Sequence, residues 1–450
     1  MYLENDVFMV LGISKSGFAA ADFLLSSGAK CYVCDEFKND DVLMSMSALK
    51  ERGAIEVDAR DAEVFVSNID VLVLSPGVPI DNRISLAAKK AGKRIIGEME
   101  LGYINSTCPV VAVTGTNGKT TTCSLISSIL DKARKKNVLV GNIGVPYISK
   151  LSKMDRSTVA VAEVSSFQLE TLSSFNPHVA VVTNISEDHL SRHYNMQNYI
   201  YLKNKILFNQ KESEYSVLNY DDYVVRGFAE KTRGKVIFFS AKEKVRGAYV
   251  QDDLIYFNDD AIMDRRLIRL KGDHNLYNIL AAVAVGKLLN IPDNVIAEAV
   301  IEFKGIKHRI EYIKTIDGID FINDSKATNP DSTIKAMASL AKPAVLLLGG
   351  RDKGQSFDSL MEACNRAMVE KVVLFGEARY KLLKAAERAE TKNICIASNL
   401  YSAVSLAFAE AASGQCVLLS PACSSFDEFS GYEERGKRFE EYINALCDAE

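Results

Sequence analysis

The sequence predicts an α/β protein of three domains, each built on a mostly parallel sheet with helices on its faces. Its 450 residues are too many for one ordinary core and suggest about three domains. Apolar and β-branched runs alternate with stretches of helical periodicity. Many of these runs stop at glycine or polar residues, as strands do at the ligand-binding edge of doubly wound sheets. We expect the domains to cover residues 1–97, 98–304 and 305–450.

Composition narrows the function classes. The chain is 48% hydrophobic and 25% charged, has a net charge of −4 and contains no long basic run, which argues against nucleic acid or an anionic membrane as the main partner. No apolar run reaches the roughly 18 residues of a membrane span, and no basic region precedes an apolar one at the N-terminus. We therefore expect a soluble, cytoplasmic protein without a membrane span. We also expect it to be a monomer.

The first domain opens with a strand at residues 7–11, a turn at 12–17, a helix at 18–27 and a strand at 30–34 that ends at Asp35. This is a Rossmann-like βαβ unit, in which an acid about 20 residues past the turn accepts ribose hydroxyls. Ser14 stands where the dinucleotide fingerprint has its middle glycine, so a plain α/β unit remains an alternative. Strands at 70–74 and 94–97 complete the domain.

The second domain is organised around residues 110–122, which read VVAVTGTNGKTTT. A buried strand, two glycines and a helix form a phosphate-binding unit, in which backbone N–H groups, the helix N-terminus, a lysine and a hydroxyl seat phosphate and Mg²⁺. Lys119 opposes the helix dipole at a cost of roughly 0.3–1 kcal/mol, which makes sense if an anion sits there. Only Thr116 and Asn117 separate Gly115 from Gly118, whereas the common loop has four residues there. The alternative is an ordinary strand-to-helix turn with a solvated lysine.

Two further strands, at 158–162 and 179–183, end at Glu163 and shortly before His189. Because parallel strands present their carboxyl ends at one edge, we expect Glu163, His189 and Lys119 to converge and to hold Mg²⁺. A histidine in this position is otherwise typical of a capping residue. Tyr199 and Lys203 lie four residues apart on one helix face, which alone indicates a solvated surface.

Residues 215–270 change to short strands, with a hairpin turn at Asp252-Asp253, and we expect them to form an antiparallel patch on the main sheet. An apolar helix follows through residue 289. The asparagines at its start either cap the helix or contact a purine edge.

The third domain begins near residue 305 with a hairpin whose tip is Asp317-Gly318. Strands at 344–348, 372–375, 393–396 and 417–419 alternate with helices and end in polar or glycine-rich segments, which predicts a second Rossmann-like sheet. Lysines and hydroxyls at these ends suit a small acidic substrate, or they are ordinary loop residues in water.

Four segments together resemble the Mur ligases, the ATP-dependent amide ligases of peptidoglycan synthesis. They are GTNGKT at 115–120, EVSSFQLE at 163–170, HR at 308–309 and NDSKATNP at 323–330. The shortened phosphate loop is this family's own form. The 12–17 turn with Asp35, SPACSSFD at 420–427 and the overall length look most like the members that add D-glutamate to UDP-N-acetylmuramoyl-L-alanine.

The resemblance implies a central P-loop ATPase-like domain, ATP and two Mg²⁺ ions as cofactors, and an acyl phosphate intermediate. It assigns catalytic roles to Lys119, Glu163, His189, Lys203 and Lys326. It assigns the metal ions to Thr120, Glu163, His189 and Lys203, the last as a carbamylated lysine. It assigns ATP to Gly115, Thr116, Asn117, Gly118, Lys119, Thr120, Thr121, Asn275, Asn278, Arg309 and Asp324.

The same resemblance implies two small-molecule partners. It places UDP-N-acetylmuramoyl-L-alanine at Ser14, Lys15, Ser16, Gly17, Asp35, Ser75, Asn142 and Gln168, and D-glutamate at Thr328, Lys353, Ser425 and Tyr432. Ser14 departs from a glycine in the family, and Glu36-Phe37 stand where some relatives carry a base-stacking arginine. The alternatives are a ligase of the same group with another amino-acid acceptor, an ATP-hydrolysing nucleotide switch, and a nonenzymatic UDP-sugar binding module.

Overall fold

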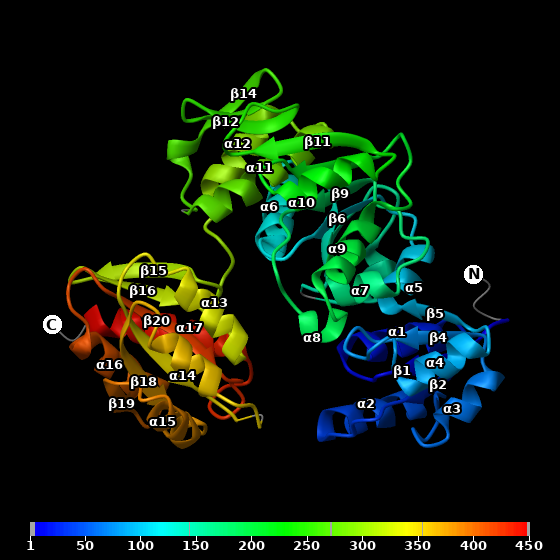
Figure 1. Cartoon of the computed structure of the whole chain (residues 1–450), viewed down its shortest axis with the longest axis horizontal. Coiled ribbons are helices and arrows are strands. Elements are labelled where there is room, and N and C mark those ends of the chain that lie inside the picture. Colours follow the sequence, from blue (N-terminus) through cyan, green and yellow to red (C-terminus); the bar gives the residue numbers. More distant parts are fainter. Residues whose placement is uncertain (1–4, 144, 271, 353, 448–450) are drawn as a thin grey trace. The chain divides into compact units, whose positions relative to one another are not determined.

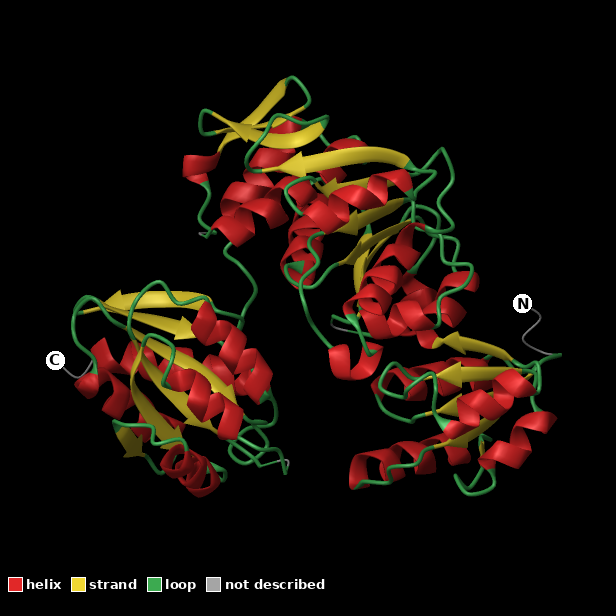
Figure 2. Cartoon of the chain, in the orientation of Figure 1, coloured by secondary structure: helices red, strands yellow, loops and turns green. Residues whose placement is uncertain are grey.

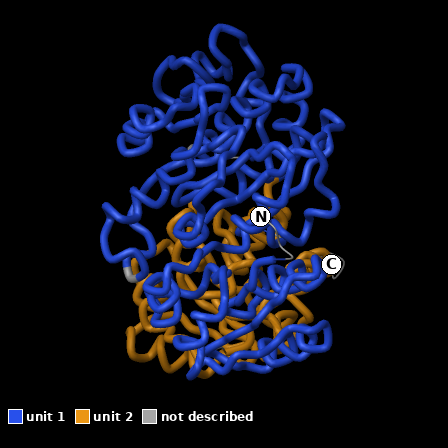
Figure 3. Tube along the Cα trace, turned by 90° about the vertical axis from the view of Figure 1, so that its right-hand side faces the viewer, with its two compact units in different colours: residues 1–304 blue, residues 305–450 orange. Residues whose placement is uncertain are grey.

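The chain forms two compact units, residues 1–304 and 305–450 (Figure 3). The computed structural model describes residues 5–143, 145–270, 272–352 and 354–447. Two sheets lie in the first unit and one in the second, and Figure 2 shows helices against each of them. The predicted fold class, α/β with three mostly parallel sheets, is confirmed. The boundary expected at residue 97 falls inside the first unit, and the three domain ranges remain predictions.

The N-terminal sheet has five parallel strands. They are β1 (Val7–Leu11), β2 (Lys30–Cys34), β3 (Ile55–Glu56), β4 (Val71–Leu74) and β5 (Arg94–Gly97), accompanied by α1 (Lys15–Ser26), α2 (Asp40–Glu51), α3 (Ala62–Phe65), α4 (Arg83–Lys90) and α5 (Glu98–Ile104). Their spatial order is β3-β2-β1-β4-β5, so successive strands are added on one side of β1 up to β3 and on its other side from β4 onward. The point between β1 and β4 where the order switches sides is here called the β1–β4 reversal. In such sheets ligands bind at this reversal, beside the loops that follow these two strands.

Helix α1 begins at Lys15, three residues earlier than the sequence predicts. The sequence pattern places Gly17 in the turn, whereas in the structure it lies in the first turn of the helix. A Cβ atom on Gly17 would approach the Gly12 carbonyl oxygen to 1.8 Å. This glycine therefore allows helix and turn to pack closely, and it does not mark the end of the turn.

The central sheet has nine strands in the order β14-β13-β12-β11-β10-β9-β6-β8-β7. The strands are β6 (Val110–Thr114), β7 (Asn137–Gly141), β8 (Val159–Glu163), β9 (Val179–Val182), β10 (Tyr215–Asn219), β11 (Lys235–Ser240), β12 (Gly247–Gln251), β13 (Leu254–Phe257) and β14 (Asp260–Asp264). The helices are α6 (Lys119–Lys132), α7 (Ser166–Glu170), α8 (Leu190–His193), α9 (Met196–Asn204), α10 (Tyr223–Arg226), α11 (Asp273–Leu288) and α12 (Asp293–Glu302).

The expected antiparallel patch is smaller than predicted. Strands β10, β11 and β12 continue the parallel pairing. Among the described strands of this sheet, the antiparallel pairs are β12–β13, joined by the Asp252-Asp253 turn, and β13–β14, joined by the turn between Phe257 and Asp260. The prediction was wrong for β10 and β11 because the chain between them forms the short helix α10 and a 3-10 turn, which provides the crossover that parallel strands need.

Buried apolar side chains cover both faces of the central sheet. On β6, Val111 and Val113 pack with α6 and α11 on one face, whereas Val110 and Ala112 belong to the cluster on the other face. Figure 1 shows α6 and α11 together beside β6. Because alternate residues of β6 are buried on opposite faces, the strand is held rigidly and fixes the loop that follows it.

The second unit is a six-stranded sheet in the order β15-β16-β20-β17-β18-β19, parallel except for the β15–β16 hairpin. Its strands are β15 (Glu311–Ile316), β16 (Ile319–Asn323), β17 (Ala344–Gly349), β18 (Val369–Phe375), β19 (Ile394–Ile396) and β20 (Cys416–Ala422). Its helices are α13 (Pro330–Ala338), α14 (Asp358–Cys364), α15 (Arg379–Arg388), α16 (Leu400–Glu410) and α17 (Tyr432–Cys447). The hairpin tip at Asp317-Gly318 is confirmed.

Short 3-10 helices complete the fold at η1 (Val66–Asn68), η2 (Tyr147–Lys153), η3 (Lys205–Leu207), η4 (Gly227–Glu230) and η5 (Arg265–Leu267). Within the described residues, no helix combines the length and the apolar character that crossing a membrane requires.

Candidate active site

The loop between β6 and α6 is tightly constrained at its two glycines. Gly115 and Gly118 have φ angles of 139° and 81°, which residues with a Cβ rarely adopt. A Cβ on Gly115 would lie 2.0 Å from Thr183 Oγ1, and one on Gly118 would lie 2.1 Å from Asn278 Oδ1. The loop therefore needs glycine at both positions, and its N–H groups can approach an anion closely.

Lys119 folds back over this loop. Its Nζ donates hydrogen bonds to the carbonyl oxygens of Gly115, at 3.0 Å, and Thr116, at 2.6 Å. The Lys119 ammonium is thereby held at the N-terminus of α6. An anion at this position would be attracted by both the ammonium and the positive end of the helix dipole. This arrangement suits a bound phosphate and disfavours the alternative of a lysine that extends into solvent.

Thr120 and Glu163 meet beside the loop. Thr120 Oγ1 donates a hydrogen bond of 2.7 Å to Glu163 Oε2, and Asn142 Nδ2 donates one of 2.7 Å to Glu163 Oε1. All three side chains lie at the carboxyl edge of the central sheet, and Glu163 is 2% exposed. A hydroxyl and a carboxylate are oxygen ligands of the kind Mg²⁺ prefers, and Mg²⁺ usually completes its shell with water and substrate phosphate. The residues present therefore fit a magnesium ion.

Within the described residues, no three or more His, Cys, Asp or Glu side chains gather in an arrangement that could hold a metal ion. The protein would thus supply Mg²⁺ with the Thr120 and Glu163 oxygens and leave most positions to phosphate and water.

Lys203 is buried, although the sequence pattern alone indicated a solvated position. It is 1% exposed, and its Nζ donates hydrogen bonds to Thr114 Oγ1 at 3.1 Å and to the Gly115 carbonyl oxygen at 2.8 Å. Burial, and next the nearby positive charge of Lys119, hold the pKa of Lys203 well below its usual value. Tyr199, one helical turn earlier, is also 1% exposed. This helix face therefore packs against the loop, and its amine favours the neutral form.

His189 lies at the start of α8 with a φ of 54°. Its ring packs on Phe167 at 4.9 Å between centroids, and its Nε2 lies 3.5 Å from Asp188 Oδ2. Half of the His189 side chain is exposed, so the imidazole remains accessible to a ligand. Its predicted role toward a metal ion remains a prediction.

A buried polar group that the sequence does not predict lies close to His189 in the chain. His193 is 2% exposed, its Nε2 shares a hydrogen bond of 2.9 Å with Ser166 Oγ, and its Nδ1 lies 3.4 Å from Glu170 Oε1. Burial, followed by the positive charges of Arg192 and other neighbours, lowers the pKa of His193 to about 4. Its neutral ring is therefore part of the packing of α7 and α8. His193 lies in a short polar run without helical or strand periodicity, so the sequence does not predict its burial.

The two asparagines of α11 lie against the loop. Asn278 Nδ2 donates to Asn275 Oδ1 at 3.2 Å, and Thr122 Oγ1 donates to Asn278 Oδ1 at 3.3 Å. Helix α11 starts after Gly272, which has no side chain to cap it. The position of the two asparagines beside Gly118 is compatible with the predicted nucleotide contacts.

In the N-terminal sheet, Asp35 organises the turn after β1. Its Oδ2 accepts a hydrogen bond of 2.6 Å from the Ile13 N–H, and its Oδ1 accepts one of 2.9 Å from the Phe37 N–H. Ser75 Oγ donates to the Gly12 carbonyl oxygen at 2.7 Å. Asp35 and Ser75 thus shape the reversal point of the sheet. Ser14, Lys15, Ser16 and Gly17 lie beside it, at the N-terminus of α1.

Gln168 lies in α7, the helix that follows strand β8 of the central sheet. It forms a capping box with Ser165: the Ser165 hydroxyl accepts a hydrogen bond from the Gln168 N–H, and the Gln168 side chain accepts one from the Ser165 N–H. The box fixes the start of α7 at Ser166, three residues after Glu163.

In the second unit, Asp324 lies at the end of β16. It is 5% exposed and accepts hydrogen bonds from Ser420 Oγ at 2.7 Å and the Ile310 N–H at 3.2 Å. Burial raises the pKa of Asp324 to about 6, partly offset by those bonds and by the charge of Arg309. Lys326 Nζ lies 6.0 Å from the centre of the Tyr432 ring, so these two predicted residues are neighbours.

Among the described residues, Thr328 and Ser425, which are also predicted to hold D-glutamate, share no hydrogen bond. Thr328 donates its N–H to the Lys326 carbonyl oxygen at 2.9 Å, and Ser425 is 2% exposed. Lys353 lies outside the described residues. The D-glutamate positions therefore remain a prediction.

Arg435 was also missed. It is fully buried, with Nε donating to Ser325 Oγ at 3.0 Å, Nη2 to the Ser325 carbonyl oxygen at 2.8 Å and Nη1 to the Cys423 carbonyl oxygen at 3.0 Å. Burial lowers its pKa to about 10. Arg435 thereby ties the segments after β16 and β20 to α17. It lies in a charged helix, a pattern that indicates solvent exposure.

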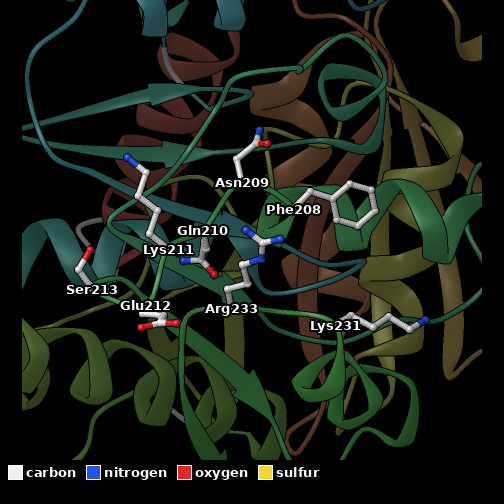
Figure 4. Close-up of a pocket in the computed structure, with 8 residues that line it drawn as sticks. All are labelled: Phe208, Asn209, Gln210, Lys211, Glu212, Ser213, Lys231 and Arg233. Carbon is white, nitrogen blue, oxygen red and sulfur yellow. The ribbon is translucent and has the colours of Figure 1, made fainter.

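A surface pocket away from these residues is shown in Figure 4. It is lined by Phe208, Asn209, Gln210, Lys211, Glu212, Ser213, Lys231 and Arg233. None of the residues predicted to bind substrate or metal lines it.

Comparison with known families decides among the alternatives. Three family models match: the Mur ligase MurD-like N-terminal domain over residues 6–97, the Mur ligase middle domain over 113–286 and the Mur ligase glutamate ligase domain over 308–423. The chain is 39% identical over 451 residues to the UDP-N-acetylmuramoylalanine–D-glutamate ligase of Clostridioides difficile, covering 99% of this chain and 100% of that protein.

The chain belongs to the Mur ligase family. A second relative with the same name, from a Thermoanaerobacter species, is 41% identical over 456 residues, which cover 99% of this chain and 100% of that protein. The predicted resemblance is confirmed.

Solved structures of Mur ligases share the fold. The UDP-N-acetylmuramate–alanine ligase MurC of Thermotoga maritima matches with a TM-score of 0.55 at 18% identity, over 98% of this chain and 100% of that one. MurF of Acinetobacter baumannii matches with a TM-score of 0.56 at 20% identity, over 83% and 85%. The Mur ligase architecture therefore extends across all three sheets.

Proposed function

We propose that the chain is an ATP-dependent ligase that joins D-glutamate to UDP-N-acetylmuramoyl-L-alanine in peptidoglycan synthesis. The observation that carries the proposal is the constrained loop with Lys119 folded over it and the Thr120–Glu163 pair beside it. It is supported by two relatives of that name, which are 39% and 41% identical to this chain over 99% of its length.

The first step activates the carboxylate of the UDP-linked substrate. One carboxylate oxygen attacks the γ-phosphorus of ATP, the bond to the ADP oxygen breaks, and an acyl phosphate forms. Lys119 and the loop N–H groups hold the phosphates in line and stabilise the charge that moves onto ADP. Thr120 and Glu163 would hold a Mg²⁺ ion, whose charge would offset that of the phosphates.

The second step forms the amide. The amine of D-glutamate attacks the acyl carbon, loses a proton as the C–N bond forms, and phosphate leaves with the former carboxylate oxygen. Water must be kept from the acyl phosphate during this step. We assign D-glutamate to the second unit, near Thr328, Ser425 and Tyr432, and the UDP-linked substrate to the β1–β4 reversal of the first unit.

The low pKa of Lys203 supports a carbamylated lysine. A neutral amine is the form that adds to carbon dioxide, and the product carries anionic oxygens that can serve a metal ion or order the loop. A second Mg²⁺ ion near His189 and Lys203, a monomeric state and a cytoplasmic location belong to the same proposal.

The test is phosphate release from ATP with purified full-length protein, UDP-N-acetylmuramoyl-L-alanine and one amino acid at a time. We expect release with D-glutamate and at most a few per cent of that rate with L-alanine, L-glutamate, L-lysine or meso-diaminopimelate. Equal or faster release with another amino acid would assign a different acceptor. Release that ignores both the amino acid and the UDP-linked substrate would identify a nucleotide switch and overturn the ligase proposal.

A further inference from the structure

Arg192 connects the two sheets of the first unit. It lies in α8, on the central sheet's side, yet its Nη2 donates a hydrogen bond of 2.9 Å to the Val78 carbonyl oxygen, and its Nη1 lies 3.5 Å from the Gly77 carbonyl oxygen. Gly77 and Val78 belong to the loop at residues 75–82 that follows β4, here called the β4 loop.

The Arg192 guanidinium also contacts two residues of α7. Its Nε and Nη2 donate to the two carboxylate oxygens of Glu170, at 3.1 and 2.6 Å, and it lies over the Phe167 ring at 5.1 Å. The Arg192 side chain is 15% exposed and that of Glu170 7%. A forked, mostly buried ion pair of this kind has little freedom, so Arg192 holds the β4 loop at a defined distance from α7.

A second contact joins the same two segments. The Tyr194 hydroxyl donates a hydrogen bond to Asp81 Oδ2, which lies near the end of the β4 loop. Tyr194 has a φ of 69° and is 71% exposed. An exposed aromatic residue in a left-handed conformation is unfavourable by itself, and the bond to Asp81 compensates for it.

Both ends of this connection reach candidate site residues. On one side, Ser75 of the β4 loop donates to the Gly12 carbonyl oxygen in the turn after β1. On the other side, the His193 ring packs against the Tyr199 ring at 5.6 Å, and Tyr199 shares a hydrogen bond of 3.0 Å with Thr116 Oγ1 in the phosphate loop. Contacts therefore run continuously from the turn beside β1 to the phosphate loop.

We propose that Arg192 is a positioning residue that sets the β4 loop, and the UDP-linked substrate beside it, relative to the phosphate loop. This inference rests on the proposed function. The substrate carboxylate must lie within about 3–3.5 Å of the γ-phosphorus to react, and a displacement of about 1 Å costs on the order of a hundredfold in rate. Arg192 touches neither reacting atom and acts by fixing the two segments that carry them.

The test compares steady-state kinetics of full-length variants with each substrate varied in turn. For Arg192→Gln we expect the KM for the UDP-linked substrate to rise at least tenfold and kcat to fall at least tenfold, with the KM for ATP within twofold. Arg192→Lys keeps the charge but replaces the planar fork with a single ammonium, so we expect it to recover part of both losses. Equal changes in all three KM values would indicate a merely structural role and would overturn the inference.

Tyr194→Phe is a second variant, which we expect to fold even if Arg192→Gln does not, because the Tyr194 side chain is exposed. We expect it to raise the KM for the UDP-linked substrate about threefold, and the double variant with Asp81→Asn to be no worse than either single variant. The matched control is Tyr201→Phe, another exposed tyrosine, on α9, which should leave all constants unchanged. Additive losses in the double variant, or no loss in Tyr194→Phe, would contradict the proposal. Failure of the wild-type protein to turn over would instead refute the proposed function.

Discussion

Replacing Gly118 by alanine tests the phosphate loop most sharply, because the chain offers a matched control. Gly118 and Gly28 have similar φ angles, 81° and 77°. A Cβ on Gly118 would lie 2.1 Å from Asn278 Oδ1, whereas one on Gly28 would meet no atom within 4 Å. Gly28→Ala therefore isolates the cost of the left-handed backbone, and Gly118→Ala adds the displacement of Asn278.

The expected magnitudes follow from these contacts. A left-handed alanine costs about 1–2 kcal/mol, so Gly28→Ala should lower the free energy of unfolding by about 1 kcal/mol once the smaller entropy of the unfolded chain is included. Moving Asn278 breaks its bonds with Thr122 and Asn275, each worth about 0.5–1.5 kcal/mol. Gly118→Ala should therefore cost roughly 2–4 kcal/mol.

The assays are urea unfolding of both variants and the KM for ATP. We expect Gly118→Ala to raise the KM for ATP at least thirtyfold, because the loop N–H groups shift away from the phosphates, and Gly28→Ala to leave it unchanged. Equal stability losses in the two variants, with ordinary ATP binding by Gly118→Ala, would refute the account of this loop.

Three further predictions address single groups. Asp324 holds its proton more tightly when folded, since burial raises its pKa from 3.8 to about 6; the stability of the second unit should fall as the pH rises between these values. Asp324→Asn should then stabilise that unit at pH 7 by up to about 3 kcal/mol, and a flat pH profile measured by hydrogen exchange would contradict this. Glu163→Gln should raise the Mg²⁺ concentration for half-maximal turnover at least tenfold, and an unchanged Mg²⁺ titration would exclude the carboxylate as a ligand. Lys203→Ala should lose activity and regain part of it with added acetate, whereas full activity without any additive would argue against a carbamylated lysine.

Much of the fold could be predicted because the strands have strong local signals. The run at 110–113 and its loop glycines lie where the structure has β6 and the start of α6, and the Asp252-Asp253 and Asp317-Gly318 turns are hairpins. Strand direction could not be predicted for β10 and β11, because it depends on the crossover between them. The start of α1 was misplaced because Gly17 serves a tertiary contact with Gly12 and not a turn.

The candidate site was predictable where chemistry and sequence spacing coincide. The glycine loop after a buried strand predicts where Lys119 and Thr120 lie, and the end of a second strand predicts where Glu163 lies. Lys203, His193 and Arg435 are buried polar residues whose neighbours come from distant segments, so no local pattern distinguishes them from surface residues. Their roles depend on the desolvation and the hydrogen bonds that only the folded chain supplies.

The central claim is that the carboxylate of the UDP-linked substrate is phosphorylated before the amide forms. The most direct measurement is the turnover of UDP-N-acetylmuramoyl-L-alanine labelled with ¹⁸O in its carboxylate, with ATP and D-glutamate, followed by mass spectrometry of the phosphate. The account predicts that the phosphate carries one oxygen from the labelled carboxylate, because that oxygen leaves with phosphorus when the amine attacks. Phosphate free of ¹⁸O, formed together with the amide, would contradict it.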